Sequence, residues 1–418
     1  MGIARRTVGR RVRVLAAVAA LSAGRAAVAE PFAVNVDVPS GPNALRVSGS
    51  SLGDLANNLV KTQGQFSTLG NTPFDASVRY GGLNDAVLYS QNATGTQATV
   101  TIPTTGFSRT FTAANQSDLR DQIRDFLRTD GSDEYARFLR SINERTQIGV
   151  TDGNPLATTA LLSDMAYDEF GLHRRPFFDP ADTERVAAGL HVDLKGGVFD
   201  TGDSSGSGWF GSATVTSGFR LGDRVGLRLG GLFSYRDLDG GSTYHAGTMV
   251  GLPVSIIPMS GGNGTGNSGV SWEVTPAFLA GASGSLDQAA GGTFLGGSVT
   301  SSLSLRAAPF TFAVANQVSF LEGYPIDVGD YDFDTDLSQQ ILKNGIKVSY
   351  DLGPGAFLDG GVTYTNFLKD AAVSSYWTPT VGVGLRFGPD SGLRVAYEGH
   401  FGDGYNAHGG VVQLYLNH

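Results

Sequence analysis

The chain has 418 residues, of which 59 are glycine and none is cysteine, and charged residues make up 17%. Soluble domains average about 25% charged residues, so the composition departs from that of an ordinary soluble enzyme. Without cysteine the chain has no disulfide scaffold, thiolate metal site or thiol nucleophile. The net charge of −9 argues against non-specific nucleic-acid binding, and nucleic acid is not an expected partner.

Residues 1–29 have the pattern of a secretory signal peptide. A basic region up to Arg13 precedes a short apolar core, and Ala27–Ala29 is a small-x-small cleavage site. The pattern predicts export, with a mature chain that starts at Glu30. No later apolar run reaches the roughly 18 residues of a membrane-spanning helix. A closed β-barrel remains possible in a membrane, because closure pairs every backbone group.

Two units are predicted before the long β region. Residues 30–115 indicate a small α+β domain, with a helix capped by Ser51 and several short strands. Residues 116–184 indicate a helical hairpin, a third helix over 156–170 and a proline-bearing connector. Both helices of the hairpin carry an apolar stripe, so each needs a surface to pack on. This helical segment is a possible plug.

The β region begins near Arg185 and continues to the end of the chain. Twelve strands of about ten residues are predicted, and each alternates apolar side chains with small or polar ones. Their centres are 188–199, 208–221, 224–236, 243–256, 269–282, 293–306, 310–321, 339–351, 356–367, 376–387, 391–402 and 409–417. The predicted fold class is mainly β: a twelve-stranded antiparallel transmembrane β-barrel after a small α+β domain and a helical segment. A soluble sandwich or soluble barrel is the alternative, because these also alternate.

The turns predict an orientation. Connections after every second strand are mostly tight, whereas the intervening loops are longer on the whole. Short turns of such barrels face the periplasm, and an even strand number leaves both barrel termini on that side. A periplasmic position is therefore expected for the N-terminal region.

Residues 185–418 resemble the outer-membrane β-barrel proteins of Gram-negative bacteria, in their twelve-strand, porin-like size class. The resemblance rests on architecture, and no family is recognised for residues 30–184. It implies location in the outer membrane, contact with its lipid and insertion by the barrel-assembly machinery. Many such proteins end in an aromatic residue that this machinery reads, whereas here the last strand carries Tyr415 and ends in His418.

The inward face is the predicted site, because the opposite strand phase is apolar. Cations outnumber anions among the expected pore-lining residues, which are Arg220, Arg228, Arg236, Arg306, Lys343, Lys347, Arg386, Arg394, Glu273 and Glu398. Arginine and lysine in a narrow lumen lower the barrier for anions. The leading hypothesis is a porin-like passive channel for small solutes with a mild anion preference.

Two alternatives to the channel stay open. Inward charges of a small barrel often pair and fill its interior, which would make a structural or interaction barrel. In the second alternative residues 156–185 thread the pore, as in autotransporter barrels, and residues 30–115 are a secreted passenger.

The remaining sequence motifs are weaker evidence for a function. No cofactor is predicted. The acidic loop at Asp330, Asp332, Asp334 and Asp336 is a weak Ca²⁺ candidate without the glycine and glutamate of an EF-hand. A G-x-S-x-G match at Ser51 recurs in a Gly/Ser loop, so it is not specific. An enzyme is not expected, and an outer-membrane hydrolase using His400 or His408 is the alternative.

Overall fold

The computed structural model describes most of the chain. The described residues are 32–38, 45–49, parts of 55–62, 72–128, 132–167, 188–201, 207–238, 241–258, 268–285, 287–288, 290–324, 326–328, 331–333, 337–353, 355–387 and 391–417. The predicted signal peptide, Ser51 and the connector at 173–182 lie outside them. Asp330, Asp334 and Asp336 do as well, and so does the side chain of Asp332.

The N-terminal domain is a six-stranded antiparallel sheet in the order β2-β1-β3-β4-β5-β6. Two helices, α4 (Gln116–Arg128) and α5 (Ser132–Arg145), contribute to its core. Phe126 of α4 stacks on Phe107, and Phe138 of α5 meets Tyr80 edge to face. The strands are β1 (Phe32–Asp37), β2 (Leu45–Gly49), β3 (Phe74–Tyr80), β4 (Leu83–Gln91), β5 (Gln97–Ile102) and β6 (Phe107–Thr112).

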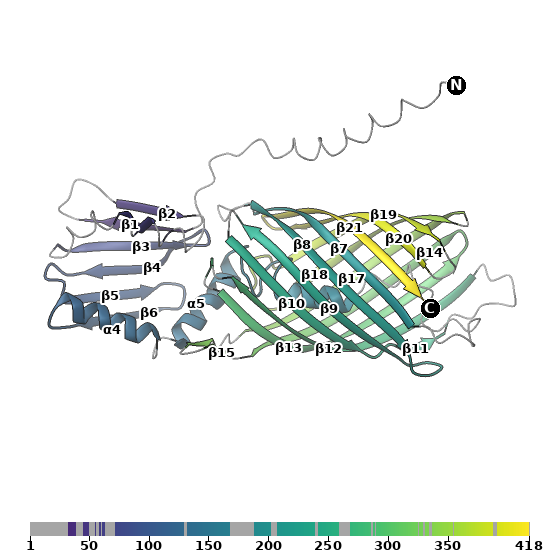
Figure 1. The fold of residues 1–418 in the computed structure, drawn as a ribbon, viewed down its shortest axis with the longest axis horizontal. Helices are drawn as coiled ribbons and strands as arrows, with labels where there is room; N and C mark the ends of the chain where they lie inside the picture. Colours follow the sequence, from purple (N-terminus) through teal and green to yellow (C-terminus); the bar gives the residue numbers. More distant parts are fainter. Residues whose placement is uncertain are drawn as a thin grey trace, which may run out of the picture.

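The second unit is a closed antiparallel barrel of twelve strands, as predicted (Figure 1). Pairing of β21 with β7 closes the sheet, so it has no free edge. A short extra strand, β11 (Val254–Ile257), pairs beside β12. The barrel strands are β7 (Ala188–Thr201), β8 (Ser207–Arg220), β9 (Gly226–Leu238), β10 (Gly241–Gly251), β12 (Ser268–Ser285), β13 (Ala290–Ala307), β14 (Phe310–Tyr324), β17 (Ser338–Gly353), β18 (Ala356–Phe367), β19 (Ser375–Arg386), β20 (Ser391–Gly402) and β21 (Tyr405–Asn417).

The two faces of the barrel differ in polarity as the alternation predicts. Outward apolar side chains are widely exposed: Val381 by 65%, Val198 by 58% and Phe233 by 54%. Residues on the inward face, such as Arg394 and Lys343, are buried. An apolar band around a whole molecule is not tolerated in water, and it fits lipid.

The barrel has two ends, one with the termini of its strand sequence and the other with the N-terminal domain. The terminal end is where β7 begins and β21 ends, and its connections are 221–225, 252–267, 308–309, 354–355 and 387–390. The domain end carries the connections 202–206, 239–240, 286–289, 325–337, 368–374 and 403–404. The longest connection, 252–267, belongs to the terminal end. Loop length alone therefore does not distinguish the two ends of the barrel, although the sequence predicted short turns at one end and longer loops at the other.

The N-terminal domain lies at the domain end, opposite the termini of the barrel (Figure 1). The Tyr80 hydroxyl donates to the Gln288 carbonyl, and the Gln147 amide donates to the Asp403 carbonyl over 2.8 Å. The backbone N–H of Val373 donates to the Gly153 carbonyl over 2.9 Å. The domain is thus seated on the rim of the barrel.

Within the described residues, no helix combines the length and the apolar character needed to cross a bilayer.

Candidate functional site: a helix inside the lumen

The third helix, α6 (Thr158–Tyr167), lies inside the barrel and packs mainly against β10 and β12 (Figure 1). Every residue of α6 except Asp164 is buried. Its apolar residues Leu161, Leu162 and Met165 belong to one buried cluster with side chains of the barrel wall. The predicted helix over 156–170 is confirmed from Thr158 to Tyr167; Leu156 and Ala157 precede it, and residues 168–170 lie outside the described residues.

One apolar contact seats α6 on the wall. Leu162 enters a notch formed by Gly247 of β10 and Gly281 of β12, which are direct partners in the sheet. A Cβ at Gly281 would lie 2.8 Å from Leu162 Cδ1, and one at Gly247 would clash more severely with Cδ2. A side chain at either position would therefore displace the end of the Leu162 side chain, and a large one would fill the notch.

Gly247→Val is expected to destabilise the seated helix by about 1–3 kcal/mol, the usual range for overpacking. The added methyl groups would occupy the place of the Leu162 side chain. Adding Leu162→Ala in the same chain should recover part of the loss, although Leu162→Ala alone leaves a cavity and destabilises. The free energy of unfolding in lipid vesicles measures this, and additive losses in the double variant would contradict the notch.

Polar contacts fix the helix at several depths. Ser163 Oγ donates to Gln317 Oε1 over 2.9 Å and lies 3.1 Å from Ser319 Oγ. The Tyr167 hydroxyl donates to the Ala315 carbonyl over 3.2 Å. At the start of the helix, Thr158 Oγ1 lies 3.1 Å from His245 Nδ1.

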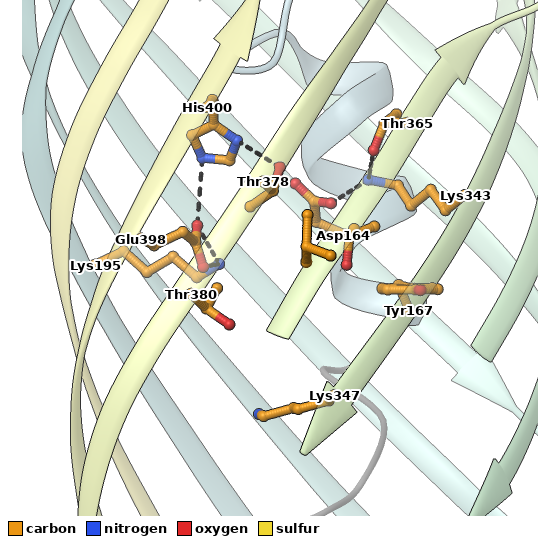
Figure 2. A pocket seen from close by; sticks show the side chains of 12 residues that line it. Asp164, Tyr167, Lys195, Lys343, Lys347, Thr365, Thr378, Thr380, Glu398 and His400 are labelled. Atoms are coloured by element: carbon orange, nitrogen blue, oxygen red, sulfur yellow. Dashed lines mark hydrogen bonds and ion pairs between the residues drawn. The ribbon is translucent and has the colours of Figure 1, made fainter. Parts of the chain in front are cut away.

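The helix also forms an ion pair with the wall. Asp164 accepts from Lys343 Nζ, which is 1% exposed and also donates to Thr365 Oγ1 over 3.5 Å (Figure 2). The aromatic rings of Tyr167 and Tyr376 lie 5.9 Å from the same ammonium. Residues 148–167, which lie inside the barrel, are called the plug. The Asp164 carboxylate of the plug therefore neutralises a buried cation of the barrel.

Across the lumen, Figure 2 shows a second charged group. Lys195 Nζ donates to both oxygens of Glu398 over 3.0 and 3.1 Å. His400 Nε2 lies 3.3 Å from Glu398, and its Nδ1 lies 3.2 Å from Thr378 Oγ1. These residues come from β7, β19 and β20, so the contacts cross-link three strands.

The most deeply buried ion pair joins Arg394 and Asp359, whose side chains are both 0% exposed. Two parallel hydrogen bonds of 2.8 and 2.6 Å connect them. Such bidentate geometry is the strong form of this interaction. Arg394 also donates to Gln413 over 2.6 Å, and Lys347 Nζ lies 3.7 Å from the same Asp359 carboxylate.

Near the domain end, the segment before α6 is held by Arg236. This guanidinium donates to the carbonyls of Ile148 and Gly149 over 2.9 and 3.3 Å, and to Asn154 Oδ1 over 3.3 Å. In the same segment, burial raises the pKa of the Asp152 carboxyl group above its usual value, and hydrogen bonds from Thr159 and Gln339 only partly offset this rise.

The remaining predicted cations lie closer to the terminal end. Asp351 is shared by Arg386, at 2.8 Å, and Arg306, at 4.0 Å. Arg228 lies 3.9 Å from Glu273. Arg220 lies 3.7 Å from Asp223 of the adjoining turn, which is fully exposed.

All ten predicted lining residues fall on the inward strand phase, but they belong to several separate groups. Sequence reasoning missed three carboxylates that pair with them: Asp351, Asp359 and Asp164. The first two share the inward phase of their strands, so strand alternation would have found them. Asp164 had no such signal, because only the position of α6 brings it to Lys343.

Small cavities lie beside the helix among the described residues. Two cavities of about 50 Å³ each lie between α6 and the wall, and both are bordered by Asp164 and Lys195. Each has room for a few water molecules. Among the described residues no cluster of three metal-ligating side chains occurs, and most of the acidic loop lies outside them.

No protein-family model matches the chain, and no curated protein matches its sequence. Solved structures match it in fold. The translocator domain of the autotransporter NalP from Neisseria meningitidis has a TM-score of 0.36 at 11% identity, covering 56% of this chain and 89% of that one. The β domain of the Bordetella autotransporter BrkA gives 0.38 at 11%, covering 55% and 99%. The NanC porin gives 0.34 at 12%, covering 54% and 100%.

These TM-scores are low, and the fold assignment rests on the closed hydrogen-bonded sheet itself. The expected likeness to outer-membrane β-barrels of Gram-negative bacteria is confirmed at the level of architecture.

Proposed function

We propose that this protein is an outer-membrane anchor that holds its N-terminal domain at the mouth of a barrel closed by its own helix. The observation that carries the proposal is the position of α6. The helix lies inside the lumen, buried on all sides, and the domain it follows is seated on the rim. Lipid around the apolar band and the assembly machinery that inserts such barrels are the partners this role requires.

The side of the membrane follows from connectivity. Barrels of this class with an even strand number keep both termini in the periplasm. The N-terminal domain sits at the opposite end, and residues 148–167 lead from it into the lumen. We therefore place the domain at the cell surface, which favours the autotransporter-like alternative over the periplasmic position expected from sequence.

The open porin-like channel stays a prediction, and it would apply to a barrel whose lumen does not hold α6. In the arrangement described, the predicted lining cations contact carboxylates or plug carbonyls, and α6 occupies the lumen. Steady passage of solutes would require the helix to leave its seat. A hydrolase that uses His400 stays an alternative: His400 lies between the Thr378 hydroxyl and the Glu398 carboxylate, and that carboxylate is also held by Lys195.

Cysteine labelling on intact cells tests the placement, because the chain has no cysteine of its own. Thr110 lies exposed on β6 of the domain, and Asp223 is fully exposed at the terminal end. A membrane-impermeant maleimide should label Thr110→Cys on intact cells and Asp223→Cys only after permeabilisation. The reverse pattern would place the domain in the periplasm and contradict the proposal.

A further inference from the structure

The inward carboxylates of the barrel strands form ion pairs with basic side chains of the same strands or of other barrel strands. Each inward carboxylate of the described strands has a cationic or histidine partner on the wall. The pairs are Asp193 with His191, Glu273 with Arg228, Asp351 with Arg306 and Arg386, Asp359 with Arg394 and Lys347, and Glu398 with Lys195.

Two wall cations depend instead on the plug. Lys343 is paired with Asp164 of α6, and Arg236 donates to the carbonyls of Ile148 and Gly149. Both cations are 1% exposed. Arg236 lies two residues from the domain end of β9, and Lys343 lies five residues into β17 from the same end. They therefore lie at successive depths of the lumen.

Lys343 and Arg236 are buried charges that need a partner. A buried charge whose partner is removed is strongly unfavourable unless water or a counter-ion replaces that partner. If α6 left the lumen together with the segment from Ile148 that leads into it, Lys343 would lose the Asp164 carboxylate and Arg236 would lose the carbonyls of Ile148 and Gly149. A small anion is the group that restores both interactions, and cations are repelled at the same two depths.

We infer that the barrel contains a latent anion-selective pore, opened when α6 leaves its seat and selective through Lys343 and Arg236. The inference rests on the proposed closed state. It assigns these two residues a second role: they hold the plug when it is present and select chloride-like anions when it is absent.

The glycine notch gives a way to unseat the helix without changing any charge. In the full-length chain, Gly247→Leu with Gly281→Leu fills the notch with apolar side chains on the lumen side. Gly231→Leu with Gly410→Leu is the matched control, because a Cβ at either of these glycines meets nothing within 4 Å. Leu162→Gln with Asp164→Asn is a second route that acts from the helix.

Planar-bilayer recordings in a potassium chloride gradient measure the result. Wild type and the Gly231/Gly410 control should be silent. The filled-notch variant should show steady currents whose reversal potential lies toward that of chloride. Adding Lys343→Gln and Arg236→Gln should move the reversal potential toward zero, whereas Lys369→Gln, at an exposed cation outside the lumen, should not.

Each outcome decides between the two proposals. Conduction by folded wild type would contradict the closed state, and with it the proposed function. Silence of both unseating variants when folded would overturn the latent pore alone. Currents that are non-selective or cation-selective, or that are unchanged by Lys343→Gln and Arg236→Gln, would overturn the assigned roles of the two cations.

Discussion

Ser163→Cys with Ser319→Cys is expected to form a disulfide in nearly every molecule. The two hydroxyl oxygens are 3.1 Å apart, and both residues are 0% exposed. A sulfur–sulfur bond of about 2 Å would need only a small approach of the helix to β14. The chain has no other cysteine, so no competing pair exists, and the outer membrane faces an oxidising compartment.

The cross-link should tie α6 to the wall and stabilise the barrel. It closes a loop between residues 156 positions apart, for which chain entropy predicts about 4 kcal/mol or more of stabilisation if the geometry is unstrained. Electrophoresis of denatured protein with and without reductant measures formation of the bond. The urea midpoint in lipid vesicles measures its effect on stability.

Ser163→Cys with Ser349→Cys is the matched control. Ser349 also faces inward on β17, but lies eight residues beyond Ile341, the sheet partner of Ser319. At about 3.3 Å per residue it is roughly 26 Å further along the wall, so no bond should form. Cross-linking of this pair, or none of the Ser163–Ser319 pair, would show that α6 does not occupy the described seat.

Asp359→Asn is expected to destabilise the barrel by about 3–5 kcal/mol, the range for removing one member of a buried ion pair. Asp359 is shared by two cations, Arg394 and Lys347, and all three side chains are at most 1% exposed. The substitution leaves two buried positive charges facing a neutral amide. The urea midpoint of the folded barrel in lipid vesicles reports the loss.

Arg394→Met gives the contrasting result. It removes one of the two cations but leaves Lys347 within 3.7 Å of Asp359, so the carboxylate keeps a partner. The loss should therefore be clearly smaller than that of Asp359→Asn. Equal losses, or the opposite order, would mean that Lys347 does not share the carboxylate.

The alternation of side chains fixed which residues face lipid and which face the lumen. Val381 and Phe233 face outward, and Arg394 and Lys343 face inward, as the pattern requires. Twelve strands could be counted because each apolar row ends at a turn signal. The aromatic residues Tyr376 and Tyr415 face inward and are buried. Their strand phase already indicated this.

The pairing of the lining charges was only partly predictable. Arg228 and Glu273, on strands separated in the chain, could be placed on one face but not at one depth, because register is a property of the closed sheet. The acidic residue that neutralises Lys343 comes from a helix outside the barrel sequence. An excess of arginine and lysine on the inward face therefore resembled an open anion channel.

Local sequence by itself determined the barrel, since a side-chain period of two and the turn residues are set by neighbours along the chain. Tertiary structure alone decided that α6 lies inside the barrel and that the domain sits opposite the barrel termini. The sequence around Leu162 predicts a helix wherever that helix lies. The notch that receives Leu162 forms only because Gly247 and Gly281 are paired on neighbouring strands. Contacts between segments so distant in the chain depend on closure of the whole sheet, which no local pattern encodes.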